Sequence, residues 1–329
     1  MKIFVTGADG LLGSNLVRKL LSEKHEVAVF LQPEKPINTL DGLNIEKYYG
    51  DILNLEDLNQ SMANCDVLIH MAANTSIWPS RSEIVKKVNI QGTSNVVKTA
   101  LLQKVKRLIY VGTANSFGFG TKENPGNETI PYKSSIYGLD YMDSKYEAQQ
   151  LVMKAVKEQQ LPAIIVNPTF MLGAYDSKPG SGAMILAIYN KKVPGYSPGG
   201  KNYVYVNDVA TAIVNAINKG RIGECYILGN KNLNYKEAFT LIANAVGVKP
   251  PKIKLPSFLA KGYGAFSSFV AKTFGSTPTV SYNMAKIACD GHYFSVNKAV
   301  KELELPQTPI EFAVKEAYNW FVENKYIKK

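Results

Sequence analysis

The sequence has few of the residues that mark metal centres, disulfide frameworks and nucleophilic triads. Its 329 residues include only three cysteines and three histidines. The cysteines form no CxxC pair, which argues against a structural zinc site and fits a reducing compartment. The histidines lie in unrelated contexts and no GxSxG segment is present. We therefore expect no metal site and no serine triad.

Arginine is also scarce, although the chain is basic. The sequence carries 38 Lys and Arg against 27 Asp and Glu, a net charge of +11, yet only four of the basic residues are arginines. Nucleic-acid readers rely on arginine and cluster their charge, whereas these lysines are spread along the chain. We expect no nucleic-acid partner, and part of the excess charge can help attract an anionic cofactor.

No uninterrupted apolar run reaches the length that spans a membrane, and the N-terminus runs directly into an apolar strand without a signal peptide. The sequence thus predicts a cytoplasmic protein with no integral membrane segment. Residues 255–275 come nearest to a span, but Lys261 and Lys272 interrupt them. They predict an amphipathic helix that covers a pocket, with association to a membrane surface left open.

Short apolar strands alternate with amphipathic helices up to Pro168. This alternation predicts a parallel sheet covered on both faces, a doubly wound α/β fold of the Rossmann type. We expect a dinucleotide-binding domain over residues 1–170 and a smaller, mostly helical substrate lobe over residues 171–329. Residues from about 201 to 229 are expected to return to the Rossmann sheet. The expected strands are 2–6, 27–30, 46–49, 66–71, 107–111, 163–166 and 224–228.

A glycine-rich loop follows the first strand. Gly7, Gly10 and Gly13 recur at intervals of three between a strand that ends at Thr6 and a helix. Glycines allow a tight turn and a close backbone approach, and the amides of a helix N-terminus favour a pyrophosphate. Leu11 and Leu12 open that helix, so the loop predicts a dinucleotide site.

The second strand lacks the acid that commonly binds the adenosine ribose of NAD. Residues 29–32, up to Gln32, contain no acid, and Glu34 comes two residues later, beyond a proline. Without an acid at this point a 2′-phosphate is not repelled, and Lys35 could attract one. We therefore expect NADP in preference to NAD.

Tyr141 and Lys145 form a Tyr-x-x-x-Lys pair, which places both side chains on one face of a helix. A nearby ammonium stabilises a phenolate and is expected to lower the pKa of Tyr141 from about 10 towards the working pH. Tyr141 is therefore a candidate general acid/base. A second pair with this spacing, Tyr282 and Lys286, lies beyond the sheet, where packing or a surface role is expected.

These motifs together resemble the extended short-chain dehydrogenase/reductases, and within them the dihydroflavonol reductase-like group of the epimerase/dehydratase family. The resemblance covers nearly the whole chain, with its motifs in the right order. The matching segments are 6–13, 50–52, 70–73, 88–93, the Tyr141/Lys145 pair, 167–173 and 203–210.

The resemblance implies further roles at the cofactor. Asp51 would bind the adenine amino group with Ile52 beside it. Ala72 and Ala73 would line the nicotinamide ribose, and the loop at Pro168 would flank the nicotinamide. The helix behind the site would carry Asn89 as a structural or relay residue, and His70 would organise a loop without acting as a base.

The catalytic hydroxyl of this group normally follows the fifth strand, where the usual paired serines are missing. Counting back from Phe117 assigns this role to Thr113, with Ser116 as the alternative. Ser116 is otherwise a loop residue near the substrate. The candidate substrate contacts are Asn74, Trp78, Ser116 and Phe170.

The resemblance implies a reductase of a ketone or aldehyde. Thr113 and Tyr141 would hydrogen-bond the carbonyl oxygen, hydride would pass from the nicotinamide, and Tyr141 would supply the proton. Lys145 would stabilise the phenolate and bind the nicotinamide ribose. Two alternatives stay open: a nucleotide-sugar epimerase with bound NAD, and a non-catalytic dinucleotide-sensing protein. A homodimer through helices such as 83–103 is expected by analogy.

Overall fold

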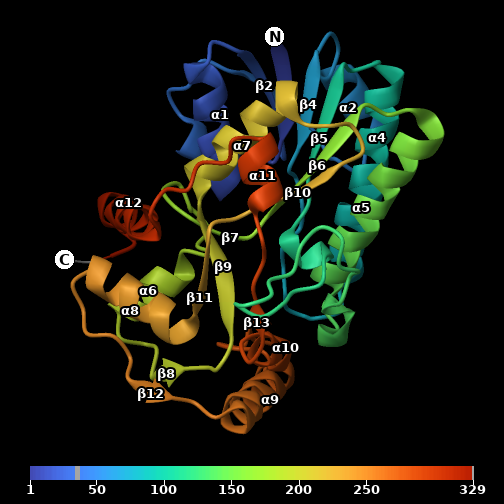
Figure 1. Cartoon of the computed structure of the whole chain (residues 1–329). Coiled ribbons are helices and arrows are strands. Elements are labelled where there is room, and N and C mark those ends of the chain that lie inside the picture. Colours follow the sequence, from blue (N-terminus) through green and yellow to red (C-terminus); the bar gives the residue numbers. More distant parts are fainter. Residues whose placement is uncertain (34–37, 328–329) are drawn as a thin grey trace.

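Seven parallel strands form the larger sheet of the structure, a computed structural model that describes residues 1–33 and 38–327 (Figure 1). All neighbouring strands pair in parallel. The chain reverses direction across the sheet between β1 and β4, which are neighbours although two strands separate them in sequence. In spatial order the strands are β10 (Cys225–Leu228), β6 (Ala163–Pro168), β5 (Arg107–Val111), β4 (Val67–His70), β1 (Lys2–Thr6), β2 (Glu26–Leu31) and β3 (Glu46–Tyr49).

Helices cover both faces of this sheet, as the buried Val, Ile and Leu of its strands require. On one face α1 (Leu11–Ser22) packs against α7 (Val206–Lys219), and the two share one hydrophobic core. A second core on the other face is formed by α2 (Leu55–Ser61), α4 (Gly92–Leu102) and α5 (Asp140–Gln159). Figure 1 shows these two helical layers on opposite sides of the strands. The predicted Rossmann-type fold is confirmed.

A smaller lobe lies below the carboxyl ends of the large sheet (Figure 1). Its four-stranded sheet has β9 at the centre, with β7 and β13 in parallel and β11 antiparallel. A separate two-stranded sheet pairs β12 with β8. The strands are β7 (Phe170–Leu172), β8 (Gly195–Tyr196), β9 (Gly200–Tyr205), β11 (Lys231–Asn234), β12 (Ile253–Lys254) and β13 (Gly291–His292). The helices are α6 (Ala183–Tyr189), α8 (Tyr235–Ala245), α9 (Ser257–Thr273), α10 (Tyr282–Ile287) and α12 (Ile310–Glu323).

The segment from 201 to 229 divides between the two parts. Helix α7 and strand β10 belong to the layers of the large sheet, whereas β9 pairs only within the smaller lobe. The short helix α11 (Asn297–Glu302) packs beside β10. The domain boundary at residue 170 stays a prediction.

The helix expected over 83–103 contains a widened turn. α3 (Glu83–Lys86) continues into a π-helical segment, Lys87–Gln91, and then into α4. Such turns are rare and often occur at functional sites. This one contains Asn89, the residue expected behind the site.

Helix α9 confirms the helix predicted within 255–275, but it does not cover a pocket with its aromatic side chains. It buries Gly264 and Ala271, and its phenylalanines are exposed. In the described residues no helix combines the length and apolar character needed to cross a membrane.

Candidate active site

The glycine loop connects β1 to α1 as predicted, and its backbone needs glycine. Gly7 has φ of +74°, and a Cβ there would lie 2.6 Å from the Ala72 amide nitrogen. A Cβ on Gly13 would lie 2.2 Å from the Gly7 carbonyl oxygen. Gly10 is instead exposed and precedes α1, whose first turn has no side-chain cap. The uncapped amides at this helix start fit a pyrophosphate.

A buried chain of hydrogen bonds joins β1 to the next loop. Thr6 Oγ1 lies 2.8 Å from His70 Nδ1, and His70 Nε2 lies 3.1 Å from Thr93 Oγ1. Because Thr93 donates to the Asn89 carbonyl, its oxygen accepts from His70, which fixes the neutral Nε2–H tautomer. Burial, with a smaller effect from Lys145, lowers the pKa of His70 to about 3. His70 thus organises the loop, as expected, and is a poor base.

The other predicted cofactor residues lie at the carboxyl ends of neighbouring strands. Gln32 is exposed directly after β2, whereas Glu34 and Lys35 lie outside the described residues. Asp51 follows β3 and accepts a hydrogen bond from the Leu53 amide through its side chain. Ile52 packs near α4, Ala72 and Ala73 follow β4, and Pro168 ends β6.

Thr113 and Tyr141 come together at the same edge of the sheet. Thr113 directly precedes a 3₁₀ turn, Ala114–Ser116, that follows β5, and Tyr141 lies in the first turn of α5. Burial raises the pKa of Tyr141 above its usual value, and a hydrogen bond from the Thr113 hydroxyl partly offsets that rise. The structure thus brings Thr113, the residue expected to replace the usual serine, close to Tyr141, the candidate acid/base.

Lys145 is buried one turn further along α5, with 4% of its surface exposed. Its ammonium donates to the Val111 carbonyl at 2.7 Å and lies 4.5 Å from the centre of the Tyr110 ring. Burial lowers the pKa of Lys145 to about 7. These contacts hold a positive charge inside the protein where few other partners are available.

The expectation that Lys145 lowers the pKa of Tyr141 is wrong for this structure. Burial dominates at Tyr141, and the group that opposes it is Thr113, not Lys145. The physical reason is that the lysine ammonium is directed to the Val111 carbonyl. Tyr141 is consequently a protonated phenol at neutral pH, the form that can donate a proton.

Asn89 ties the loop after β4 to the catalytic helix. It accepts from the Asn74 amide at 2.7 Å and donates to the Asn74 carbonyl at 3.0 Å. Its amide also donates to Ser144 Oγ at 2.9 Å, next to Lys145. Asn89 therefore fixes the distance between the predicted nicotinamide loop and α5.

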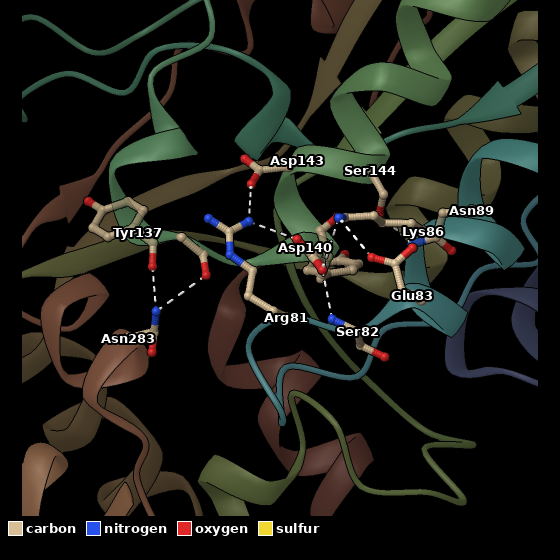
Figure 2. A network of polar contacts seen from close by, with 12 residues as sticks. Arg81, Ser82, Glu83, Lys86, Asn89, Tyr137, Asp140, Asp143, Ser144 and Asn283 are labelled. Carbon is tan, nitrogen blue, oxygen red and sulfur yellow. Dashed lines mark hydrogen bonds and ion pairs between the residues drawn. The ribbon is translucent and has the colours of Figure 1, made fainter.

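A set of polar contacts around Asp140, the Asp140 clamp, also holds the start of α5 (Figure 2). The sequence analysis did not predict it. Arg81 donates to Asp140 at 2.7 Å and to Asp143 at 3.0 Å, and the Ser82 amide donates to Asp140 at 2.7 Å. Asp140 is 1% exposed; burial would raise its pKa, but Arg81 and Ser82 outweigh burial and lower it. Two features of the sequence could have indicated it. An aspartate directly precedes Tyr141, and Arg81, one of the four arginines of the whole chain, lies in the loop after β4.

Helix α10 closes this corner from the smaller lobe. The Asn283 amide donates to the carbonyls of Tyr137 and Gly138, just before α5 (Figure 2). Met284 packs in the same apolar cluster as Tyr141. The second Tyr-x-x-x-Lys pair lies on this helix, and Lys286 donates to the Ile136 carbonyl, a packing role as expected.

Residues 3–229 match the NAD dependent epimerase/dehydratase family. The chain belongs to this family. It is 32% identical, over 99% of its length and 96% of the relative's, to a protein of Synechocystis sp. provisionally named a dihydroflavonol 4-reductase. It is 27% identical to the sterol demethylase protein B of Methylococcus capsulatus, over 99% of this chain and 100% of that one. The crystal structure of gox2253 aligns with a TM-score of 0.87 at 34% identity, covering 99% of each chain.

This epimerase/dehydratase family member is therefore an NAD(P)-dependent oxidoreductase of the extended short-chain type, with a nicotinamide dinucleotide as its cofactor. The residues present fit that cofactor, because the loop at Gly7 tolerates no side chain and the first turn of α1 is uncapped.

The candidate substrate residues differ in how far packing already occupies them. Ser116 is buried, and its hydroxyl has no hydrogen-bond partner among the described residues. Trp78 is partly buried, and its carbonyl accepts from Ser76. Phe170 meets Tyr203 edge-on, with ring centres 5.4 Å apart. Asn74 is held by Asn89. Their contact with substrate stays a prediction.

Proposed function

We propose that this protein is a reductase that prefers NADP and acts on a ketone or aldehyde with a hydrophobic or aromatic body. The observation that carries the proposal is the Thr113–Tyr141 pair beside buried Lys145. This group lies at the edge of the sheet that also carries the glycine loop of a dinucleotide site.

The mechanism assigns one task to each side chain. A bound nicotinamide dinucleotide supplies the hydride that adds to the carbonyl carbon. Thr113 and Tyr141 donate hydrogen bonds to the carbonyl oxygen, and Tyr141 passes its phenolic proton to that oxygen as negative charge develops. Lys145, one turn further along α5, would bind the nicotinamide ribose. Acid/base help of this kind contributes about 10²–10⁴-fold.

The protonated phenol of Tyr141 fits the reductive direction. A phenol whose pKa lies above its usual value is protonated at neutral pH, so it is ready to act as an acid. Oxidation of an alcohol would need the phenolate instead. Reduction is therefore the reaction for which the resting site holds the correct proton.

NADP preference is the second part of the proposal. Gln32 follows β2 where NAD-binding relatives of this fold commonly carry an acid, so no carboxylate at that position repels a 2′-phosphate. Asp51 and Ile52 would bind the adenine, Ala72 and Ala73 the nicotinamide ribose, and Pro168 the nicotinamide itself.

A nucleotide-sugar epimerase is the alternative on this fold. Such an enzyme needs cations for the diphosphate of its substrate. The one arginine after residue 170, Arg221, is already paired with Glu302 and Glu224. That engagement supports the reductase. A dinucleotide sensor would have no need of a Thr113–Tyr141 pair.

The proposal is tested by spectrophotometry with NADPH and NADH side by side. A panel of hydrophobic ketones and aldehydes is compared with nucleotide-sugars, and loss of NADPH absorbance with a carbonyl is the expected result. A clear preference for NADH would contradict the interpretation of Gln32. Protein that purifies with bound NAD and interconverts nucleotide-sugars would establish the epimerase instead. We also propose that two copies of the chain pair through α4 and α5. Light scattering, which measures the molecular mass in solution, checks whether a dimer forms.

A further inference from the structure

Helix α9 presents its largest apolar side chains to solvent. The exposed fractions are 72% for Phe258, 67% for Phe266 and 70% for Phe269. Leu259 and Tyr263 on the same helix are also more than half exposed. A monomeric soluble protein rarely leaves so many large apolar groups together on one element, and such patches mark interaction sites.

The orientation of α9 follows from what it buries. Gly264 and Ala271, two turns apart, are its buried positions, and they lie against α10. A Cβ on Gly264 would lie 2.7 Å from the Ala285 Cβ, so the two helices are in close contact. At 100° per residue, Phe266 and Phe269 project from the opposite side of the helix. The packing of α9 on the protein is thus complete without its phenylalanines.

Charge around the helix is of one sign. From Ala238 to Cys289 the chain contains six lysines and neither aspartate nor glutamate. Four of them lie near or on α9. Lys252 directly precedes β12, Lys254 lies in β12, and Lys261 and Lys272 lie on the helix itself. None of these four forms an ion pair with another residue in the described ranges.

An apolar face bordered by unpaired lysines matches one kind of surface in particular. Helices that lie in a membrane interface combine aromatic side chains with lysines that reach anionic headgroups. A second copy of this chain would bring the same positive charges together, which disfavours a symmetric pair through α9. An acidic protein could satisfy the lysines but would have to supply a large apolar groove as well.

We propose that α9, with Lys252 and Lys254 beside it, docks this protein on the surface of an anionic lipid bilayer. The phenylalanines enter the headgroup boundary and the lysines contact acidic headgroups. Figure 1 shows α9 at the lower extremity of the molecule, beyond α10, where a flat surface can reach it. This inference does not depend on the reductase proposal.

Docking through α9 would place the bilayer on the side of the protein where α5 begins and Tyr141 lies. Helix α10 lies between α9 and α5, and its Met284 shares an apolar cluster with Tyr141. An apolar substrate dissolved in the bilayer would then leave it on the side of the protein where Tyr141 lies.

The test is flotation of the full chain with vesicles. One set is phosphatidylcholine alone, and the other is an equal mixture of phosphatidylcholine and phosphatidylglycerol. We expect binding to the anionic vesicles that weakens strongly at about 1 M salt. The variant F258S/F266S/F269S should lose roughly tenfold in partitioning for each phenylalanine. The control F312S changes a phenylalanine that is 54% exposed on α12, and it should bind as the wild type does.

Several results would overturn the proposal. Absence of binding to anionic vesicles would do so, as would equal loss in F312S. A wild-type dimer that the triple variant dissociates would identify a second copy as the occupant of α9. If the triple variant does not fold, K252Q/K254Q, which removes two exposed charges, should still lower anionic binding severalfold. Unchanged binding in that variant would refute the lysine contacts.

Discussion

The first turn of α5 and the middle of α9 reverse the usual distribution of side chains in opposite ways. Helix α5 buries Asp140 and Lys145, which other helices would expose. Helix α9 exposes Phe266 and Phe269, which other helices would bury. Charged groups at α5 are matched by partners at hydrogen-bond distance, whereas no partner covers the apolar groups of α9 among the described residues.

This difference separates two kinds of function. The start of α5 is already organised, because Asp140 and Lys145 each have a hydrogen-bond partner within the protein before any ligand binds. The outer face of α9 is exposed in the structure. Burying its apolar side chains would release free energy only when another molecule covers them. Changes at α5 should therefore alter stability and turnover, and changes at α9 should alter association alone.

The largest expected effect on stability comes from Asp140→Ala. The substitution leaves Arg81 without its buried partner and the Ser82 amide without its acceptor. Arg81 is largely exposed and keeps Asp143, so the cost comes from the lost charge-assisted hydrogen bonds and the unsatisfied Ser82 amide, about 1–3 kcal/mol. Urea unfolding measures the change in the free energy of unfolding. The conservative variant Asp140→Asn should recover part of it, and a wild-type value for Asp140→Ala would show that the clamp is not stabilising.

Thr113→Val should lower kcat by about 10²-fold, because it removes one of two donors to the developing oxyanion without changing the shape of the site. Thr113→Ser should restore most of the activity. Steady-state kinetics with NADPH and the best carbonyl of the panel measures both. Ser116→Ala is the informative comparison: a larger loss there than in Thr113→Val would transfer the catalytic hydroxyl to Ser116.

Acid should destabilise the fold through its buried histidines. Burial lowers the pKa of His70 and of His292 to about 3, against 6.5 in the unfolded chain. Between these values the unfolded state binds more protons, so stability falls as the pH falls, by about 1.4 kcal/mol per pH unit for each histidine. Unfolding in urea at pH 7 and pH 5.5 measures this slope. In His70→Gln the slope should decrease by the contribution of one histidine. An unchanged slope would contradict the burial of a neutral His70.

The smallest effect is expected at α9. F266S/F269S should change the free energy of unfolding by no more than about 0.5 kcal/mol, because both rings are already exposed. Thermal melting without lipid is the measurement. A loss of several kcal/mol would show that these rings pack within the protein, and the contrast between α5 and α9 would fail.

Much of the fold and part of the site could be predicted from the sequence. Strand–helix alternation and the segment around Gly7 depend on neighbours in sequence, so they predicted the sheet and its loop. The clamp on Asp140 could not be predicted in the same way, because Arg81 is 59 residues away and only the folded chain brings them together. The pKa of Tyr141 was mispredicted for a related reason: spacing indicates that Lys145 is near, but not that its ammonium is directed to Val111.

The central claim is that Tyr141 donates the proton to a reduced carbonyl. Turnover of Tyr141→Phe, measured with NADPH and the best carbonyl substrate, tests it most directly. We predict a fall in kcat of about 10²–10⁴-fold, with the dissociation constant for NADPH unchanged in a fluorescence titration. Turnover close to that of the wild type would contradict the account and remove Tyr141 from the mechanism.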